Sequence, residues 1–128
     1  MTNNKRLEEI NAMWRDYIAS VVNADIEAFE SFHAAIFIGH VGEGVIESDR
    51  AKRMADIASV FEQASNPGDV HALQPRRHNV SLLSDDIAVC DYECFLRNEQ
   101  VNYAMSAILH RENGSWLIVH SADSASEP

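Results

Sequence analysis

The last third of the chain, from Leu83 to Ser124, limits most narrowly what this sequence can fold into. It predicts three consecutive strands separated by short polar turns, over about residues 87–97, 101–111 and 116–124. The first and third of these strands are apolar on both faces, whichever way their side chains alternate. A sheet that is apolar on two sides has to be covered on two sides. We therefore expect helices of this chain on one face and a second copy or a partner on the other.

The first half of the chain predicts the helices that form one of these covers. Apolar residues from Leu7 to Val21 recur at helical spacing and predict a helix over about residues 5–22. Asp25 is placed to cap a second helix, and either Ser48 or Asp49 is placed to cap a third. The helices precede the three-stranded segment, which is typical of an α+β fold with helices packed on one face of a sheet.

Shorter strands complete the expected order of elements. Residues 36–38 predict a strand that ends at Gly39-His40, and residues 41–47 predict a loop or small hairpin. A further strand is expected over about residues 71–83, with Pro75 at an edge position or a bulge. The predicted order is ααβ(β)αββββ, in one domain spanning residues 1–128 and ordered over about 5–124. The long strands should twist into a curved, mixed or antiparallel sheet that leaves a cone-shaped cavity beside the first helix.

Composition excludes several functional classes. The formal net charge is −10, and a phosphate backbone would be repelled, so no nucleic-acid partner is expected. No apolar run approaches the roughly 20 residues that span a bilayer, and the first residues lack the apolar segment of a secretory signal. We therefore expect no membrane partner and a cytoplasmic location. Cys90 and Cys94 would lie roughly 13 Å apart on one strand, too far for a disulfide, so reduced thiols are expected.

Three motifs resemble a known superfamily. Residues 110–124, HRENGSWLIVHSADS, resemble the closing hairpin of SnoaL-like domains and the pattern H-R-x-D/N-G-x-W-x-x-V-H-x-H-x-S of the calcium/calmodulin-dependent protein kinase association domain. Residues 83–89 are similar to the G-D-D/E-A-A/V turn of this family. Tyr17 followed by Asn23-Ala24-Asp25 resembles the Y-x(6)-G/A-D helix pair of ketosteroid isomerases. The resemblance covers nearly the whole chain. It implies the superfamily named after nuclear transport factor two, and with it a cystatin-like α+β barrel, a cone-shaped sheet around three helices.

The sequence departs from these relatives at positions that matter for chemistry. Ala122 stands where many relatives have a second histidine, and Asp123 stands where the kinase association domain has a pocket arginine. No acid near Ile108 matches the second carboxyl group of the ketosteroid isomerase oxyanion site. The isomerase mechanism is therefore not carried over whole.

The turn at Glu112-Asn113-Gly114 sets the expected register of the last hairpin. A type I turn with a G1 bulge would pair Ala107 with Val119 and Met105 with Ser121. A two-residue turn at Asn113-Gly114 would shift the register by one residue and mix the two faces. Similarity to relatives places the face with Val119 and Asp123 inside, together with Cys90, Tyr92 and Cys94 of the preceding strand. The other face, with Trp116, Ile118 and His120, is then the expected surface for self-association.

A mostly apolar cavity with a few polar groups suits a small, largely apolar ligand that bears a carbonyl or a hydroxyl. Asp123 is the best candidate for a base, since burial raises the pKa of a carboxyl group; the alternative is a solvated carboxylate at the rim. His40 falls near the position of the ketosteroid isomerase base, and the alternative is a loop histidine bound to backbone. Tyr17 could stabilise an enolate oxygen, or only pack in the core. The expected ligand-binding residues are Trp14, Tyr92, Tyr103, Met105, Val119 and Ser121; a tryptophan such as Trp14 is more often a core residue than a stacking platform.

No cofactor, metal site or catalytic nucleophile is predicted. The six histidines have no paired spacing on one helix, and metal sites need several converging ligands. The first hypothesis is thus a homodimeric SnoaL-like domain that binds a small apolar molecule. If it is an enzyme, it would be a cofactor-free acid–base isomerase, cyclase or dehydratase acting on a carbonyl compound. The alternatives are a non-catalytic association module, dimeric or of higher order, and a ligand sensor without turnover.

Overall fold

The computed structural model describes residues 2–41, 47–62, 73–97 and 100–127. These residues form three helices and six strands in the expected order, which confirms the α+β class. The elements are α1 (Asn3–Val22), α2 (Ile26–Ser31), β1 (His33–Val41), β2 (Glu47–Asp49), α3 (Arg50–Glu62), β3 (Leu73–Leu82), β4 (Ile87–Leu96), β5 (Val101–Glu112) and β6 (Ser115–Ser126). Most of the loop or hairpin expected over residues 41–47 lies outside the described residues.

Aspartate side chains begin two of the three helices. Asp25 Oδ1 accepts a hydrogen bond of 3.1 Å from the backbone N–H of Ala28 at the start of α2. Asp49 Oδ1 accepts one of 2.8 Å from Lys52 at the start of α3, so the cap of this helix is Asp49 and not Ser48. Each bond satisfies a backbone donor that has no partner within its own helix.

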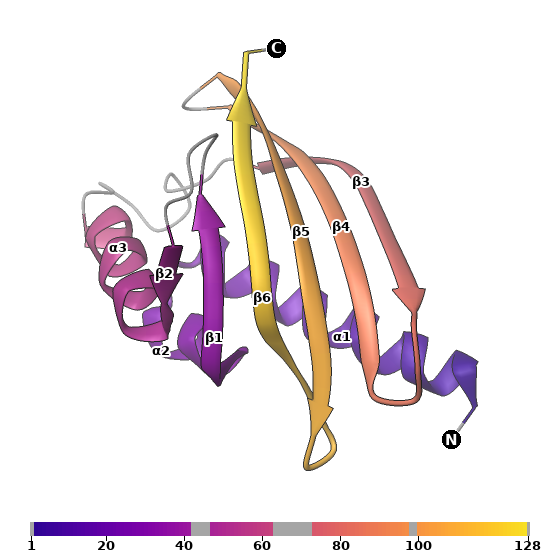
Figure 1. Cartoon of the computed structure of the whole chain (residues 1–128). Coiled ribbons are helices and arrows are strands. Elements are labelled where there is room, and N and C mark those ends of the chain that lie inside the picture. The colour runs from indigo at the N-terminus through magenta and orange to yellow at the C-terminus, as the bar shows by residue number, and fades with distance from the viewer. Residues whose placement is uncertain (1, 42–46, 63–72, 98–99, 128) are drawn as a thin grey trace.

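The six strands form one sheet in the order β2-β1-β6-β5-β4-β3. Strand β6 pairs in parallel with β1 and antiparallel with β5, so the sheet is mixed. Strand β3 lies at one edge, and its register shifts between Pro75 and Arg77, which confirms the expected edge position and bulge. Figure 1 shows that the sheet is curved and that its edges at β2 and β3 do not meet, so it does not close into a barrel.

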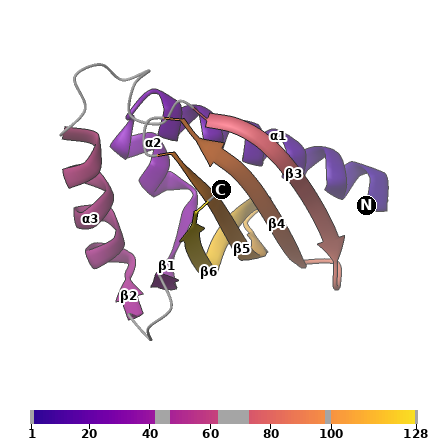
Figure 2. The ribbon, with the colours of Figure 1, turned by 90° about the horizontal axis from the view of Figure 1, so that it is seen from above.

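All three helices lie on the concave side of the sheet (Figures 1 and 2). The core between helices and sheet contains Ile10, Trp14 and Tyr17 of α1, all at most 4% exposed. It also contains Cys90 and Cys94, which are buried free thiols as predicted. The opposite face of the sheet is not covered by any helix among the described residues. None of the described helices is long and apolar enough to cross a membrane.

The turn between β5 and β6 differs from the expected three-residue turn. Asn113 and Gly114 both have positive φ angles, 50° and 82°, and Glu112 pairs with Ser115, so the loop has two residues. Positive φ at both central residues is the geometry of a type I′ turn, which Asn-Gly favours. The predicted pairs of Ala107 with Val119 and Met105 with Ser121 were wrong: Ala107 pairs with Ser121, and Met105 with Asp123. The two-residue turn shifts the register by one residue, and a bulge in β6 adds the second.

A bulge at Val119 decides which residues of β6 face the helices. Leu109 pairs with Ile118, whereas Ile108 pairs with His120, which leaves Val119 as the extra residue. The bulge keeps Ile118 on the same face as Ser121, although an uninterrupted strand would place them on opposite faces. Ile118 and Trp116 are 0% and 3% exposed and lie in the core. Their predicted place on the outer face was wrong, because a uniform alternation was assumed.

Candidate functional site

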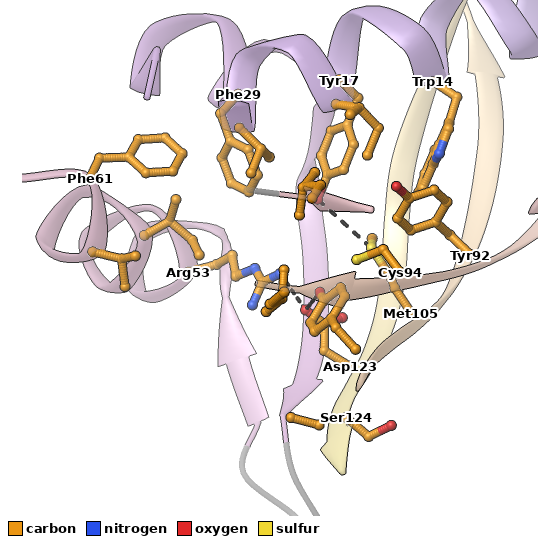
Figure 3. A pocket seen from close by; sticks show the side chains of 18 residues that line it. Trp14, Tyr17, Phe29, Arg53, Phe61, Tyr92, Cys94, Met105, Asp123 and Ser124 are labelled. Atoms are coloured by element: carbon orange, nitrogen blue, oxygen red, sulfur yellow. Dashed lines mark hydrogen bonds and ion pairs between the residues drawn. The ribbon is translucent and has the colours of Figure 1, made fainter. Parts of the chain in front are cut away.

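A cavity of about 370 Å³ lies between the helices and the concave face of the sheet (Figure 3). Its volume is at the lower end of the roughly 300–1,000 Å³ range of small-molecule sites. Most of its wall is apolar. The lining residues are Trp14, Tyr17, Ile18, Val21, Phe29, Arg53, Ile57, Val60, Phe61, Leu73, Tyr92, Cys94, Leu96, Tyr103, Met105, Asp123, Ser124 and Ala125.

Helical periodicity builds the helix side of the cavity. Trp14, Tyr17, Ile18 and Val21 fall at positions i, i+3, i+4 and i+7 of α1, so they share one face of that helix. The strand side follows the alternation of β4, where Tyr92 and Cys94 point inwards, and of β5 and β6. The cavity is thus the space between this face of α1 and the inward-facing side chains of the sheet, which include Tyr92, Cys94 and Met105.

A buried ion pair lies at the sheet side of this cavity. Asp123 Oδ2 accepts a hydrogen bond of 2.6 Å from Arg53 Nη2 and one of 2.5 Å from the Tyr103 hydroxyl. The side chains of Arg53 and Asp123 are only 9% and 5% exposed. Arg53 comes from α3, Tyr103 from β5 and Asp123 from β6, so the pair ties a helix to the sheet.

Two polar atoms of this pair are buried without a hydrogen-bond partner among the described residues: Asp123 Oδ1 and Arg53 Nε. The Tyr17 hydroxyl is only weakly hydrogen-bonded, because it donates to the weak acceptor Met105 Sδ at 3.8 Å. Buried polar atoms are usually paired, and leaving one unpaired costs about 1–3 kcal/mol. The site therefore offers one strong acceptor and at least two donors to a bound molecule.

Both phenols of the site are neutral donors at physiological pH. Burial raises the pKa of Tyr17, although the positive charge of Arg53 partly offsets this. Burial and the negative charge of Asp123 raise the pKa of Tyr103 well above its usual value. Burial alone would lower the pKa of Arg53, but the attraction of Asp123 raises it overall, so the guanidinium stays charged.

Six of the predicted site residues do line this cavity, namely Tyr17, Asp123, Trp14, Tyr92, Tyr103 and Met105. Asp123 is 6% exposed, so the alternative of a solvated carboxylate at the rim does not describe it. Trp14 is both a core and a lining residue, and its ring stacks on Tyr17 at 5.0 Å between centroids.

The structure does not bring His40, Val119 and Ser121 to the cavity. Phe37 and Gly39 of β1 are buried on the inner face, so His40 lies on the outer face, where its ring centroid is 5.1 Å from that of His120. Val119 is the bulged residue and is only half-buried. Ser121 is buried at 1% exposure on the inner face, where its Oγ lies beside Gly39 and not in the cavity wall.

Arg53 is the charged residue of the cavity that was not predicted from the sequence. It lies at the same face of α3 as Ile57 and Phe61, with spacings of four residues. A charged residue that continues an apolar stripe into the core needs a buried partner of opposite charge. That position in the stripe was the signal that could have identified it.

No group of three metal-ligating side chains occurs among the residues that the structure describes. His33 is the most buried histidine among the described residues, at 3% exposure, and its Nδ1 lies 2.9 Å from the carbonyl oxygen of Phe29. Its ring packs against Phe29 and Phe37, at 4.8 Å between centroids in both cases. It therefore has a structural role in the aromatic core.

Comparison with solved structures gives relatives of the same fold. An NTF2-like protein of unknown function from Pseudomonas putida superposes with a TM-score of 0.81 at 14% identity, over 98% of this chain and 90% of that one. A cystatin-like fold protein from Burkholderia xenovorans gives a TM-score of 0.77 at 17% identity, over 98% of this chain and 95% of that one. A protein described as a calcium/calmodulin-dependent protein kinase II association domain from Xanthomonas campestris gives 0.68 at 16% identity, over 92% and 86%.

These likenesses define the class of the molecule: an α+β protein of the cystatin-like, NTF2-like fold. Residues 10–126 match the family model of the SnoaL-like domain. The chain therefore belongs to the SnoaL-like family, which confirms the resemblance seen in its motifs. No curated protein matches it significantly.

Proposed function

We propose that this domain binds a small, largely apolar molecule in the cavity between α1 and the sheet. The observation that carries the proposal is Asp123 Oδ1, a buried acceptor that has no partner beside the buried Arg53. A bound hydrogen-bond donor would remove the cost of leaving this atom unpaired. A cytoplasmic location, as expected from the sequence, is part of the proposal.

The shape and lining of the cavity support binding by an apolar body. Phe29, Phe61 and Met105 offer aromatic and thioether surface in the same cavity wall as the ion pair (Figure 3). Burial of apolar surface supplies roughly 25 cal/mol per Å², so the body of the ligand would provide most of the affinity. The polar cluster would then orient it.

The same geometry would suit cofactor-free acid–base chemistry on a carbonyl compound. Asp123 Oδ1 would take a proton from the carbon next to the carbonyl, and the electron pair of that C–H bond would move into an enolate. Tyr17 would donate a hydrogen bond to the enolate oxygen. Return of the proton to another carbon gives isomerisation, attack of the enolate on a second carbonyl gives cyclisation, and loss of hydroxide gives dehydration.

Binding is tested with the neutral, apolar dye Nile red, whose fluorescence rises in an apolar site. Ile57 lines the cavity, so Ile57→Trp should fill it and abolish the fluorescence gain. Ile108 lies on the outer face at 39% exposure, and Ile108→Trp is the matched control that should leave the gain intact. Equal binding by both variants would reject the cavity as the site.

Catalysis is tested separately, by turnover of a panel of enolisable carbonyl compounds. Asp123→Asn and Tyr17→Phe should each lower turnover, by roughly 10²–10⁴-fold for loss of the base. His40 lies outside the cavity, so His40→Ala should have no effect. Turnover that is unchanged in Asp123→Asn would remove Asp123 from the mechanism, and the domain would then be a binding module without catalysis.

The second candidate function is assembly, and the outer face of the sheet favours it. Ile36, Ile38 and Ile108 are 78%, 46% and 39% exposed there, close to the strand that carries His120. Trp116 and Ile118 are in the core and cannot contribute to this surface. The candidate interface is a dimer or higher oligomer formed through these isoleucines. Sedimentation should show an oligomer that Ile36→Lys dissociates, whereas a wild-type monomer at micromolar concentration would reject the assembly function.

A further inference from the structure

We propose that the cavity selects a ligand whose buried head group carries no net charge and both donates and accepts a hydrogen bond, as a primary amide or a hydroxyl does. This inference rests on the proposed binding function and names the class of ligand for the same site. It excludes carboxylates and amines as the head group.

The balance of charge in the cavity favours a head group without net charge. Arg53 and Asp123 are the only charged side chains among the described residues that line it, and they neutralise each other across 2.6 Å. A carboxylate brought to this point would find Arg53 already paired, and an amine would find Asp123 already paired. Either head group would add an uncompensated charge at a place where both existing charges are more than 90% buried.

The unpaired polar atoms favour a head group that both donates and accepts a hydrogen bond. Asp123 Oδ1 can only accept a hydrogen bond, so the ligand has to donate one. Arg53 Nε and the Tyr17 hydroxyl can donate, so the ligand also has to accept one. Figure 3 shows Tyr17 pointing from α1 towards the part of the cavity wall that holds Arg53 and Asp123.

A ketone or an ester alone would satisfy only the donors of the site and leave Asp123 Oδ1 unpaired. A site that leaves a buried polar group unpaired discriminates strongly against the ligand that fails to reach it. Primary amides and alcohols carry both functions in one small group. A carbonyl substrate, if the domain has one, would meet the same demand through an adjacent hydroxyl.

The experiment compares four probes that share one alkyl chain: octanamide, octanol, octanoate and octylamine. Their affinities for the wild-type protein are measured at pH 7 by displacement of Nile red. Octanamide and octanol should bind at least about tenfold more tightly than the two charged probes. Octanoate or octylamine binding as tightly as octanamide would overturn the inference while leaving the binding function intact. Failure of Nile red and of all four probes to bind would remove the binding function as well.

A charge variant inverts the expected selectivity. Asp123→Asn leaves the buried Arg53 without its counter-charge, so the affinity for octanoate should rise at least about tenfold. Asp91→Asn is the matched control, because it removes one negative charge from the outer face and should change no affinity. Asp91 Oδ1 accepts a hydrogen bond of 2.8 Å from Ser106 Oγ on that face. Octanoate affinity that is equal in both variants would overturn the inference. The wild-type comparison decides the question even where the Asp123→Asn protein fails to fold.

Discussion

The two faces of the sheet carry similar apolar residues but bury them to very different extents. On the concave face, Leu109 and Ile118 are 0% exposed beneath the helices. On the convex face, their neighbour Ile108 is 39% exposed, and Ile36 of β1 is 78% exposed. Figure 2 shows the reason: all described helices lie on one side, and nothing described covers the other.

Polar groups on the two faces differ in the same way. On the convex face, Asp91 and Ser106 bond to each other in contact with water, which can satisfy their remaining lone pairs. On the concave face, Asp123 Oδ1 has no such access, and its need for a partner is unmet. The comparison teaches that burial, and not the type of residue, decides whether a polar group is left without a partner.

Breaking the buried ion pair should produce the largest difference between the faces. Arg53→Met leaves the carboxylate of Asp123 buried without its counter-charge, which costs about 3–5 kcal/mol of the free energy of unfolding. The exposed pair of Lys52 and Asp56 is the control, and Lys52→Met should cost less than about 1 kcal/mol. Urea denaturation measures both. The double variant Arg53→Met with Asp123→Leu should recover most of the loss, and a cost for Arg53→Met no larger than that of the control would contradict the burial of the pair.

Truncating one isoleucine on each face tests the bulge at Val119. Ile118→Ala removes a fully buried side chain and should lower the free energy of unfolding by about 2–5 kcal/mol. Ile108→Ala on the convex face should lower it by less than about 1 kcal/mol. Chemical denaturation of the two variants side by side gives the answer. The reverse order of effects would mean that β6 alternates without a bulge.

The stability of the concave side should also depend on pH through His33. Burial holds the pKa of His33 at about 4, below the value near 6.5 that it has when unfolded. The unfolded state therefore binds more protons between these two values, so the stabilisation is complete above about pH 6.5 and is lost as the pH falls towards 4. The loss should approach about 3 kcal/mol.

The matched variant for this prediction is His33→Asn. It places an amide N–H where the Nδ1 atom of His33 meets the Phe29 carbonyl, but it has no proton to gain. Thermal denaturation at a series of pH values should show a flatter dependence for the variant than for the wild type. Parallel curves for the two proteins would show that His33 titrates normally in the folded state.

The smallest expected difference concerns two neighbours on β1. A methyl group at Gly39 would lie 2.8 Å from Phe37 Cζ on the concave face, so Gly39→Ala should cost about 1–3 kcal/mol as the ring shifts. His40 points to the convex face, and His40→Ala should change stability by no more than about 0.5 kcal/mol. Differential scanning calorimetry can resolve both. A Gly39→Ala protein that is more stable than the wild type would mean that the core around Phe37 can accommodate an additional methyl group without strain.

The elements of the fold could be predicted because their signals are local. The apolar spacing from Leu7 to Val21 defines α1 without reference to the rest of the chain. Asp25 caps α2 through a hydrogen bond to a backbone N–H only three residues away. Pro75 cannot donate to a neighbouring strand, so its position at an edge follows from its chemistry. Such signals act within a few residues and survive any tertiary arrangement.

The last hairpin was harder because two interpretations of its turn competed. Asn113-Gly114 is itself a strong signal for a two-residue turn, and the structure has that turn. The bulge at Val119, however, has no local signature. It arises because Ile118 packs in the core and also donates its N–H to the Phe32 carbonyl at 2.7 Å, a contact with a distant segment.

The candidate site could be predicted only in part for the same reason. Tyr17 and Asp123 follow from periodicity on a helix and on a strand, together with the family resemblance. The partner of Asp123 is 70 residues away along the chain, on a helix whose distance from β6 no local pattern encodes. His40 was misplaced because its position came from the resemblance to ketosteroid isomerases, whereas the alternation of β1 turns Phe37 inwards and His40 outwards.

The parallel pairing of β6 with β1 has a consequence for how the protein is made. Ile38 pairs with His120, so the middle of the sheet joins segments that are far apart along the chain. During synthesis, β6 leaves the ribosome after every other described element, and until then β1 and β5 present unpaired inner edges. Long-range closure of this kind slows folding and prolongs exposure to aggregation. The strand that completes the sheet also brings Asp123, so the chain completes its candidate site and gains its protection from aggregation in the same late step.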